Sequence, residues 1–212
     1  MIGASQKKLT VLAVAPHPDD IEIGCGGSLV KLGKAGHHVH LMVMTQGDAG
    51  GDADQRVREQ TAAARLYKAK SLHWGGFEDT RVPLSKESID ALDAVIKKVK
   101  PDLVLAPWGD DSHQDHRNTS AQIRSATRYT QNVLFYEVPS TIDFLPDVFV
   151  EITKELPAKL RALQAHKSQV HKLNVAGLSI LDAARSMAHF RGYQGRVKAA
   201  EGFKALRLRL DF

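Results

Sequence analysis

The feature that most limits the fold of this 212-residue chain is the alternation of short apolar runs with longer amphipathic segments. Runs rich in Val, Leu and Ile predict buried strands at 9–15, 37–45, 71–74, 102–108, 132–138 and 147–152. Helical spacing and capping signals predict helices at 26–36, 54–70, 86–100, 119–129, 157–173 and 180–192. Asp54 and Ser85 are the expected caps of the second and third, and Pro157 is expected in the first turn of the fifth. Such alternation is the signature of βαβ units with right-handed crossovers. We therefore expect one α/β domain, a Rossmann-like three-layer fold with a mostly parallel sheet.

Composition narrows the functional class. The apolar share of 43% and the charged share of 25% are those of an ordinary globular protein. No run approaches the roughly 18 apolar residues of a membrane span, and the first residues lack the apolar centre of a secretory signal. The single cysteine excludes an internal disulfide. A cytoplasmic enzyme without a membrane span is the expectation.

The net charge of +5 raises the question of an acidic partner. Lys and Arg are scattered along the chain, and no basic run interleaves with aromatic residues as nucleic-acid grooves require. We therefore expect no nucleic-acid partner.

Two loops of unusual composition follow predicted strands. "PHPDD" (16–20) follows the strand at 9–15, and "GDDSHQDH" (109–116) follows the strand at 102–108. Functional groups of open parallel sheets collect outside the carboxyl ends of the strands. We therefore expect both loops at one edge of the sheet. In the second loop, Asp110 and Asp111 could cap a helix or bind a second cation, but the expectation is a solvated loop.

The pair Asp19–Asp20 is not explained by the common alternatives. "GCGG" (24–27) lacks the G-x-G-x-x-G spacing of a dinucleotide site, and a pyrophosphate there would face two carboxylates. Capping the next helix requires only one Asp. Adjacent carboxylates repel unless a cation separates their roles. The pair therefore favours a metal site.

The ligand types indicate which metal. His17 and Asp20 are three residues apart and can turn toward one point, while His113 and His116 offer two more imidazoles. Three N/O ligands with one open position are typical of catalytic zinc, which lowers the pKa of water toward about 7. We expect Zn²⁺, although Fe²⁺ would accept the same ligands.

"PHPDDIEIGCGG" (16–27) and "HQDH" (113–116) resemble the LmbE-like family of zinc-dependent N-deacetylases. That family includes the N-acetylglucosaminyl-phosphatidylinositol deacetylases and the sugar deacetylases of bacillithiol and mycothiol synthesis. "RVRE" (56–59) is similar to its R-x-x-E helix start, and 159–169 and 190–203 look like segments of the bacillithiol branch. Many members read P-H-P-D-D-E. Here Ile21 follows Asp20 and the acid is Glu22, which gives the D-D-x-E spacing of the bacillithiol branch. The resemblance covers nearly the whole of residues 1–212.

The resemblance implies a role for each residue of the first loop. His17, Asp20 and His116 would bind zinc. Asp19 would be the general base that takes a proton from the zinc-activated water. One aspartate would thus bind the ion while its neighbour stays free to work on the water.

The resemblance also implies residues around this centre. His113 would act as an acid, or as a cation beside the tetrahedral oxyanion. Asp115 would sit against a histidine and tune its orientation and charge. Arg56 would hold the sugar, together with an aspartate in the loop after the third strand, for which Asp79 is the match.

The expected activity is zinc-dependent N-deacetylation, in which a metal-activated water hydrolyses the acetamide of an N-acetylglucosamine-type sugar or conjugate. The alternatives are a zinc hydrolase of another amide or ester, and a non-catalytic metal- or sugar-binding protein. The alternating end "LRLRLDF" (206–212) predicts an amphipathic edge strand that could pair with another subunit. Because family members are often trimers or hexamers, we expect a homo-oligomer.

Overall fold

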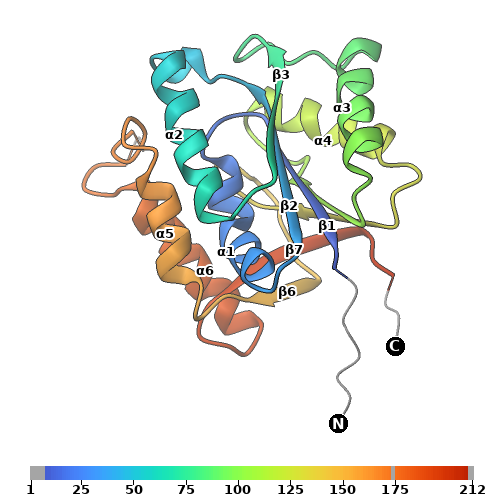
Figure 1. The fold of residues 1–212 in the computed structure, drawn as a ribbon. Helices are drawn as coiled ribbons and strands as arrows, with labels where there is room; N and C mark the ends of the chain where they lie inside the picture. Colours follow the sequence, from blue (N-terminus) through green and yellow to red (C-terminus); the bar gives the residue numbers. More distant parts are fainter. Residues whose placement is uncertain (1–7, 173–174, 210–212) are drawn as a thin grey trace.

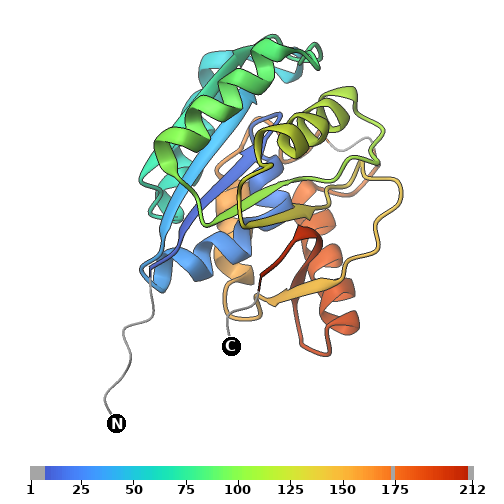
Figure 2. The ribbon, with the colours of Figure 1, turned by 90° about the vertical axis from the view of Figure 1, so that its right-hand side faces the viewer.

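The computed structural model describes residues 8–172 and 175–209, which form a sheet covered by helices on both sides (Figures 1 and 2). The strands are β1 (Thr10–Ala15), β2 (His38–Thr45), β3 (Ser71–Phe77), β4 (Leu103–Pro107), β5 (Asn132–Tyr136), β6 (Val148–Glu151) and β7 (Ala200–Arg207). The helices are α1 (Asp20–Lys34), α2 (Ala53–Leu66), α3 (Lys86–Val99), α4 (Gln114–Ala126), α5 (Leu156–Gln164) and α6 (Ile180–Gln194), with a short 3₁₀ turn η1 (Asp48–Gly50).

The sheet order is β3-β2-β1-β4-β5-β7-β6. The first five strands pair in parallel, and β7 runs antiparallel to both β5 and β6. Alternate residues of β1 enter different cores: Val11 and Ala13 pack with α1, α2, α5 and α6, whereas Leu12 and Val14 pack with α3 and α4. The predicted α/β three-layer fold with a mostly parallel sheet is confirmed.

Helix α1 begins at Asp20, six residues before the predicted start. Glycines lower helix propensity, but here they allow close packing. A Cβ at Gly24 would lie 2.0 Å from the ring of Tyr136, and one at Gly27 would lie 2.8 Å from Ile152. Tertiary packing therefore overrides the low propensity of the glycine-rich segment, and the helix starts inside the first unusual loop.

Other helix boundaries also differ from prediction. Asp52, not Asp54, caps α2 by accepting a hydrogen bond from the backbone N–H of Gln55. Helix α4 begins at Gln114, so that the second unusual loop supplies its first turn. Helix α5 ends at Gln164, well before the predicted end at residue 173, which lies outside the described residues. The predicted cap at Ser85 and the proline in the first turn of α5 are both observed.

The predicted edge strand at 206–212 is described in part: residues 206–207 end strand β7 beside β5 alone, because the pairs between β6 and β7 cover only residues 200–203. Strand β7 begins at Ala200 and lies between β5 and β6, so β3 and β6 form the two edges. The alternating pattern covers only the end of β7, so it did not indicate that the strand begins at Ala200. Residues 210–212 lie outside the described part. Among the described helices, none has the length and apolar character needed to cross a membrane.

A buried ion pair between α5 and β7 also binds backbone groups of α1. Lys159 Nζ of α5 lies 2.6 Å from Glu201 Oε1 of β7, and both side chains are 3% exposed. Lys159 also donates to the carbonyl of Ile23, while Glu201 accepts from the backbone N–H groups of Gly27 and Ser28. Both charges are therefore neutralised and hydrogen-bonded within the core.

We expect Lys159→Met to lower the free energy of unfolding by about 3–5 kcal/mol, because it leaves the Glu201 carboxylate buried without its cation. Urea denaturation measures the change. The control is Lys86→Met, which breaks the exposed Lys86–Asp90 pair and should cost less than about 1 kcal/mol. Equal costs for the two variants would contradict this account.

Candidate metal and acid–base site

The two unusual loops meet at one edge of the sheet. His17 and Asp20 lie in the turn from β1 to α1, and His116 lies in the first turn of α4, just after β4. Strands β1 and β4 are neighbours: the chain runs from β1 through β2 and β3 on one side of β1, and returns through α3 to β4 on the other side. Such a switch point opens a crevice at the carboxyl ends of the strands, where ligands of α/β proteins bind.

Three ligand atoms form a triangle in this crevice. His17 Nδ1 lies 3.2 Å from Asp20 Oδ2 and 3.3 Å from His116 Nε2, and His116 Nε2 lies 3.4 Å from Asp20 Oδ2. A single proton can bridge only one side of such a triangle. Tetrahedral zinc with bonds of 2.0–2.1 Å would separate its ligands by about 3.3–3.4 Å. The three atoms therefore fit the ligand spacing of one small divalent ion.

The outer nitrogen of each imidazole in the triangle faces a carboxylate. His17 Nε2 lies 3.1 Å from Asp115 Oδ2 and 3.0 Å from Asp79 Oδ1, and His116 Nδ1 lies 3.1 Å from Asp111 Oδ2. These carboxylates hold the N–H on the outer nitrogens. The inner nitrogens then direct their lone pairs into the triangle, as in the carboxylate–histidine–metal arrangement.

Asp111 was predicted to be solvated, and this prediction is wrong. The residue is 1% exposed. Besides His116, its carboxylate accepts hydrogen bonds from the His113 backbone N–H and from the hydroxyls of Ser140 and Thr141. Its role depends on the loop after β5, which supplies both hydroxyls, so no local motif could have indicated it.

We expect Asp111→Asn to weaken metal affinity by about 10–100-fold, since the amide can no longer hold the same tautomer of His116 as firmly. Competition with a coloured chelator measures the dissociation constant. Asp110→Asn is the matched control, because Asp110 is exposed in the same loop. The metal affinity of this variant should equal that of the wild type. An unaltered affinity in Asp111→Asn would remove this carboxylate from the site.

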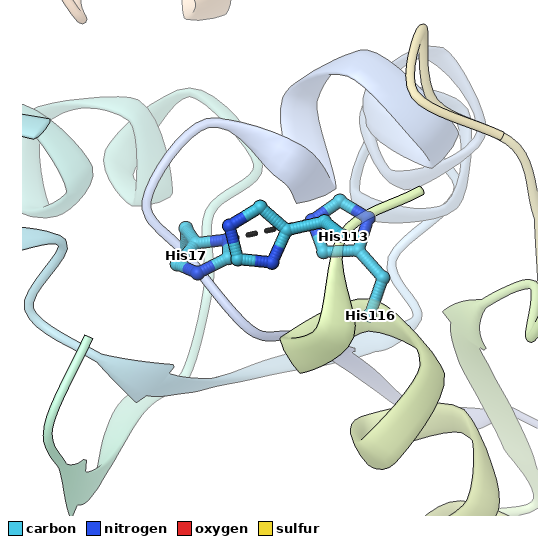
Figure 3. A group of neighbouring side chains, drawn as sticks. All are labelled: His17, His113 and His116. Carbon is cyan, nitrogen blue, oxygen red and sulfur yellow. Dashed lines mark hydrogen bonds between the residues drawn. The ribbon is translucent and has the colours of Figure 1, made fainter. Parts of the chain in front are cut away.

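Two other groups of ligand atoms also converge here. Ligand atoms of His17, His113 and His116 lie within 4.8 Å of one another, as do those of His17, Asp79 and Asp115. Figure 3 shows the three imidazoles close together, with His113 and His116 extending from the start of α4 toward His17. His113 Nδ1 accepts the backbone N–H of Asp115, so its Nε2 carries the proton in the neutral ring. Burial, followed by the charges of His17 and His116, lowers the pKa of His113.

Asp19 occupies the N-cap position of α1 in the left-handed region, with φ 95° and ψ −25°, and its side chain makes no capping hydrogen bond. Its side chain is 13% exposed and lies 3.6 Å from the guanidinium of Arg56. Burial and then the neighbouring charge of Asp20 raise the pKa of Asp19 to about 7. Burial alone would also raise the pKa of Asp20, but His116 and His17 hold it far below its ordinary value. The two adjacent carboxyls thus titrate in different ranges.

The other two predicted site residues, Arg56 and Asp79, line the same cavity as Asp19. Arg56, 5% exposed, donates to the carbonyls of Gly47 and Pro18 at 2.6 and 2.8 Å. Asp79 accepts the backbone N–H of Ala49 as well as facing His17. A cavity of about 380 Å³ joins them to the triangle, and its walls are formed by His17, Asp19, Asp20, Ala49, Gly50, Arg56, Asp79, Thr80, His113, His116 and Ser140.

Comparison with known proteins identifies the family. Residues 12–127 match the PIG-L family of GlcNAc-PI de-N-acetylases. The chain is 35% identical over 178 residues to the uncharacterized deacetylase YaiS of Escherichia coli K12, a match that covers 79% of this chain and 96% of that one. It is 30% identical over 185 residues to diacetylchitobiose deacetylase of Thermococcus kodakarensis, a match that covers 75% of this chain and 69% of that one. The chain therefore belongs to the PIG-L, or LmbE-like, family.

Two further similarities support this assignment. A probable N-acetyl-α-D-glucosaminyl L-malate deacetylase 2 of Bacillus cereus is 26% identical over 186 residues, covering 77% of this chain and 84% of that one. The crystal structure of the conserved protein TT1542 from Thermus thermophilus superposes with a TM-score of 0.85 at 27% identity, covering 96% and 97% of the two chains. The family is that of deacetylases, and the fold is the one its solved members share.

Proposed function

We propose that this protein is a metal-dependent N-deacetylase that hydrolyses the acetamide of an N-acetylglucosamine-type sugar or conjugate. The observation that carries the proposal is the ligand triangle of His17, Asp20 and His116, with the Asp19 carboxylate outside the triangle but in the same cavity. The names of the relatives support the substrate class, because they include deacetylases of diacetylchitobiose and of an N-acetylglucosaminyl malate conjugate.

His17, Asp20 and His116 would hold the ion. Two imidazoles and one carboxylate suit Zn²⁺, and Fe²⁺ accepts the same donors. When bound, such an ion supplies a Lewis acid that polarises a carbonyl group and lowers the pKa of water. The remaining chemistry falls to the side chains around it.

Asp19 is the proposed general base. It takes the proton of the attacking water and then delivers it to the leaving amine as the C–N bond breaks. A base works best when its pKa is near the working pH. Burial and the charge of Asp20 place the pKa of Asp19 in that range.

His113 is the proposed donor to the developing oxyanion. Its Nδ1 is engaged by the Asp115 backbone N–H, which leaves Nε2–H to donate into the cavity. Its lowered pKa favours a neutral donor over a cation. Preorganised donors of this kind are usually among the largest contributions to acyl-transfer catalysis. Asp115 is proposed to hold His17 in its tautomer.

Arg56 and Asp79 are the proposed sugar contacts. Both line the cavity next to Asp19. The Asp79 carboxylate can accept from sugar hydroxyls, and the guanidinium of Arg56 can donate to them. In the described structure both side chains are already held by backbone groups, so they are preorganised for this contact.

The test is a turnover assay of Zn²⁺-reconstituted protein against a panel of N-acetylglucosamine conjugates, with matched acetate esters and other amides. We expect one equivalent of acetate per free amine from at least one sugar conjugate. Hydrolysis of esters or unrelated amides alone would favour a different metal hydrolase. Binding without acetate release would favour a metal- or sugar-binding protein. A homo-oligomer and a cytoplasmic location stay predictions.

A further inference from the structure

Glu22 is the acid of the first motif that the proposed mechanism does not use. It lies in the first turn of α1, two residues after Asp20, and it is fully buried. Its Oε1 accepts a hydrogen bond from Gln60 Nε2 at 3.0 Å, and its Oε2 lies 3.3 Å from His166 Nε2. Gln60 thus holds one oxygen of the buried carboxylate by a hydrogen bond, whereas His166 meets the other only at ion-pair distance, without hydrogen-bond geometry.

Gln60 connects this carboxylate to the proposed base. The residue is fully buried on α2. Its Oε1 accepts the backbone N–H of Asp19 at 3.2 Å, while its Nε2 donates to Glu22. The amide is therefore used at both ends, and a continuous chain of contacts runs from the Asp19 backbone through Gln60 and Glu22 to His166.

The far end of the chain is a buried histidine. His166 follows α5 and is fully buried. Among the described residues, neither of its ring nitrogens has a hydrogen-bond partner, so its contact with Glu22 is an ion pair that forms when the imidazole is protonated. Two residues later, Ser168 donates through its backbone N–H and its hydroxyl to Glu59 of α2. The segment carrying His166 is thus fixed to α2 (teal in Figure 1), next to Gln60.

The turn at Asp19 needs such support. A non-glycine residue in the left-handed region is strained, and it persists only where the surroundings determine it. Arg56 fixes the carbonyl of the preceding residue, Pro18, and Gln60 fixes the N–H of Asp19 itself. Together they hold the peptide that joins Pro18 to Asp19, and that peptide sets the direction of the Asp19 carboxylate.

We propose that Gln60, Glu22 and His166 form a positioning chain that holds the Asp19 turn and thereby aims the general base. The proposal rests on the proposed function, since it assigns to Asp19 the role of base. These three positioning residues touch neither substrate nor ion. They act through Asp19, so removing a link changes the rate only while Asp19 is there to be aimed.

The test is a double-mutant cycle between Gln60→Met and Asp19→Asn, measured on the zinc-loaded protein. Because small misplacements of a reacting group are costly, Gln60→Met should lower kcat by at least about tenfold, with KM and zinc content unchanged. In the Asp19→Asn background the same change should cost less than about twofold. An equal loss in both backgrounds, or wild-type kcat in Gln60→Met, would overturn the proposal.

A matched control and a second variant guard against a general folding effect. Gln122 is another fully buried glutamine, on α4, whose amide donates to the Pro83 carbonyl, and Gln122→Met should keep kcat within about twofold. His166→Leu should lower kcat as Gln60→Met does, and His166→Gln, which keeps a donor for Glu22, should restore most of it. A Gln122→Met loss as large as that of Gln60→Met would also contradict the proposal.

An activity-independent measurement separates this proposal from the proposed function. Amide hydrogen exchange at Asp19, followed by NMR, should accelerate by at least about tenfold in Gln60→Met, because the N–H loses its acceptor. Unchanged exchange would show that Gln60 does not hold the turn. If exchange is faster in Gln60→Met but the wild-type protein releases no acetate, the positioning contact is supported and only the deacetylase assignment is refuted.

Discussion

Asp19→Asn is expected to lower kcat/KM for the acetylated sugar by about 10²–10⁴-fold, the contribution typical of a positioned acid–base group. Asparagine is the suitable replacement because it matches the shape of aspartate and tolerates the left-handed backbone. It cannot accept the proton of the attacking water. The zinc content of the variant should stay at that of the wild type, since Asp19 lies outside the ligand triangle.

The pH profile tests the same role. The base works only when deprotonated, so kcat/KM should fall as pH drops through the pKa of Asp19. That pKa is raised to about 7 by burial and by Asp20, and the charge of a bound cation shifts it downward. The acidic limb should therefore lie at or below about pH 7 and vanish in Asp19→Asn. A variant with wild-type rates and an unchanged limb would exclude Asp19 as the base.

His116→Ala is expected to remove both the metal and the activity. Two remaining ligands, His17 and Asp20, cannot hold a small divalent ion at the three-ligand spacing of a catalytic site. After dialysis, elemental analysis should find less than about 0.1 equivalent of zinc, and acetate release should fall to background. Because protons compete for the same imidazoles, loss of the ion on acidification should occur at a higher pH in weakened variants.

His113→Ala is the matched control for this variant. His113 is three residues earlier, and its ring stacks on His116 with the centroids 5.1 Å apart. As a proposed oxyanion donor outside the triangle, it should leave the zinc content intact while lowering kcat by about 10²–10³-fold. Zinc loss in His113→Ala together with zinc retention in His116→Ala would move the metal site to a different set of ligands.

The parallel sheet could be predicted from the sequence because its strands are buried on both faces. A strand such as 9–15 then appears as a continuous apolar run. In the helices between the strands, apolar residues instead recur with the helical spacing, so the two kinds of element can be told apart. The start of α1 was missed because the decisive contacts, Gly24 against Tyr136 and Gly27 against Ile152, are distant in the chain. The place of β7 was missed because strand order depends on pairing, which a local pattern does not encode.

The candidate site also contains residues that the local sequence indicates and contacts that only the folded structure reveals. His17, Asp20 and His116 occur in compact motifs at strand ends, so local sequence indicates them. The supporting contacts of Asp111 with Ser140 and of Gln60 with Asp19 join segments 29 and 41 residues apart. Such contacts follow from tertiary packing, and only the coordinates reveal them.

The central claim is that His17 Nδ1, Asp20 Oδ2 and His116 Nε2 hold one divalent ion while the Asp19 carboxylate stays free. Anomalous X-ray diffraction at the zinc absorption edge, on crystals grown with zinc, tests it most directly. We predict a single strong peak about 2.0–2.2 Å from each of these three atoms, with neither Asp19 oxygen at bonding distance. A peak between Asp79 and Asp115, or one bound by Asp19, would contradict it.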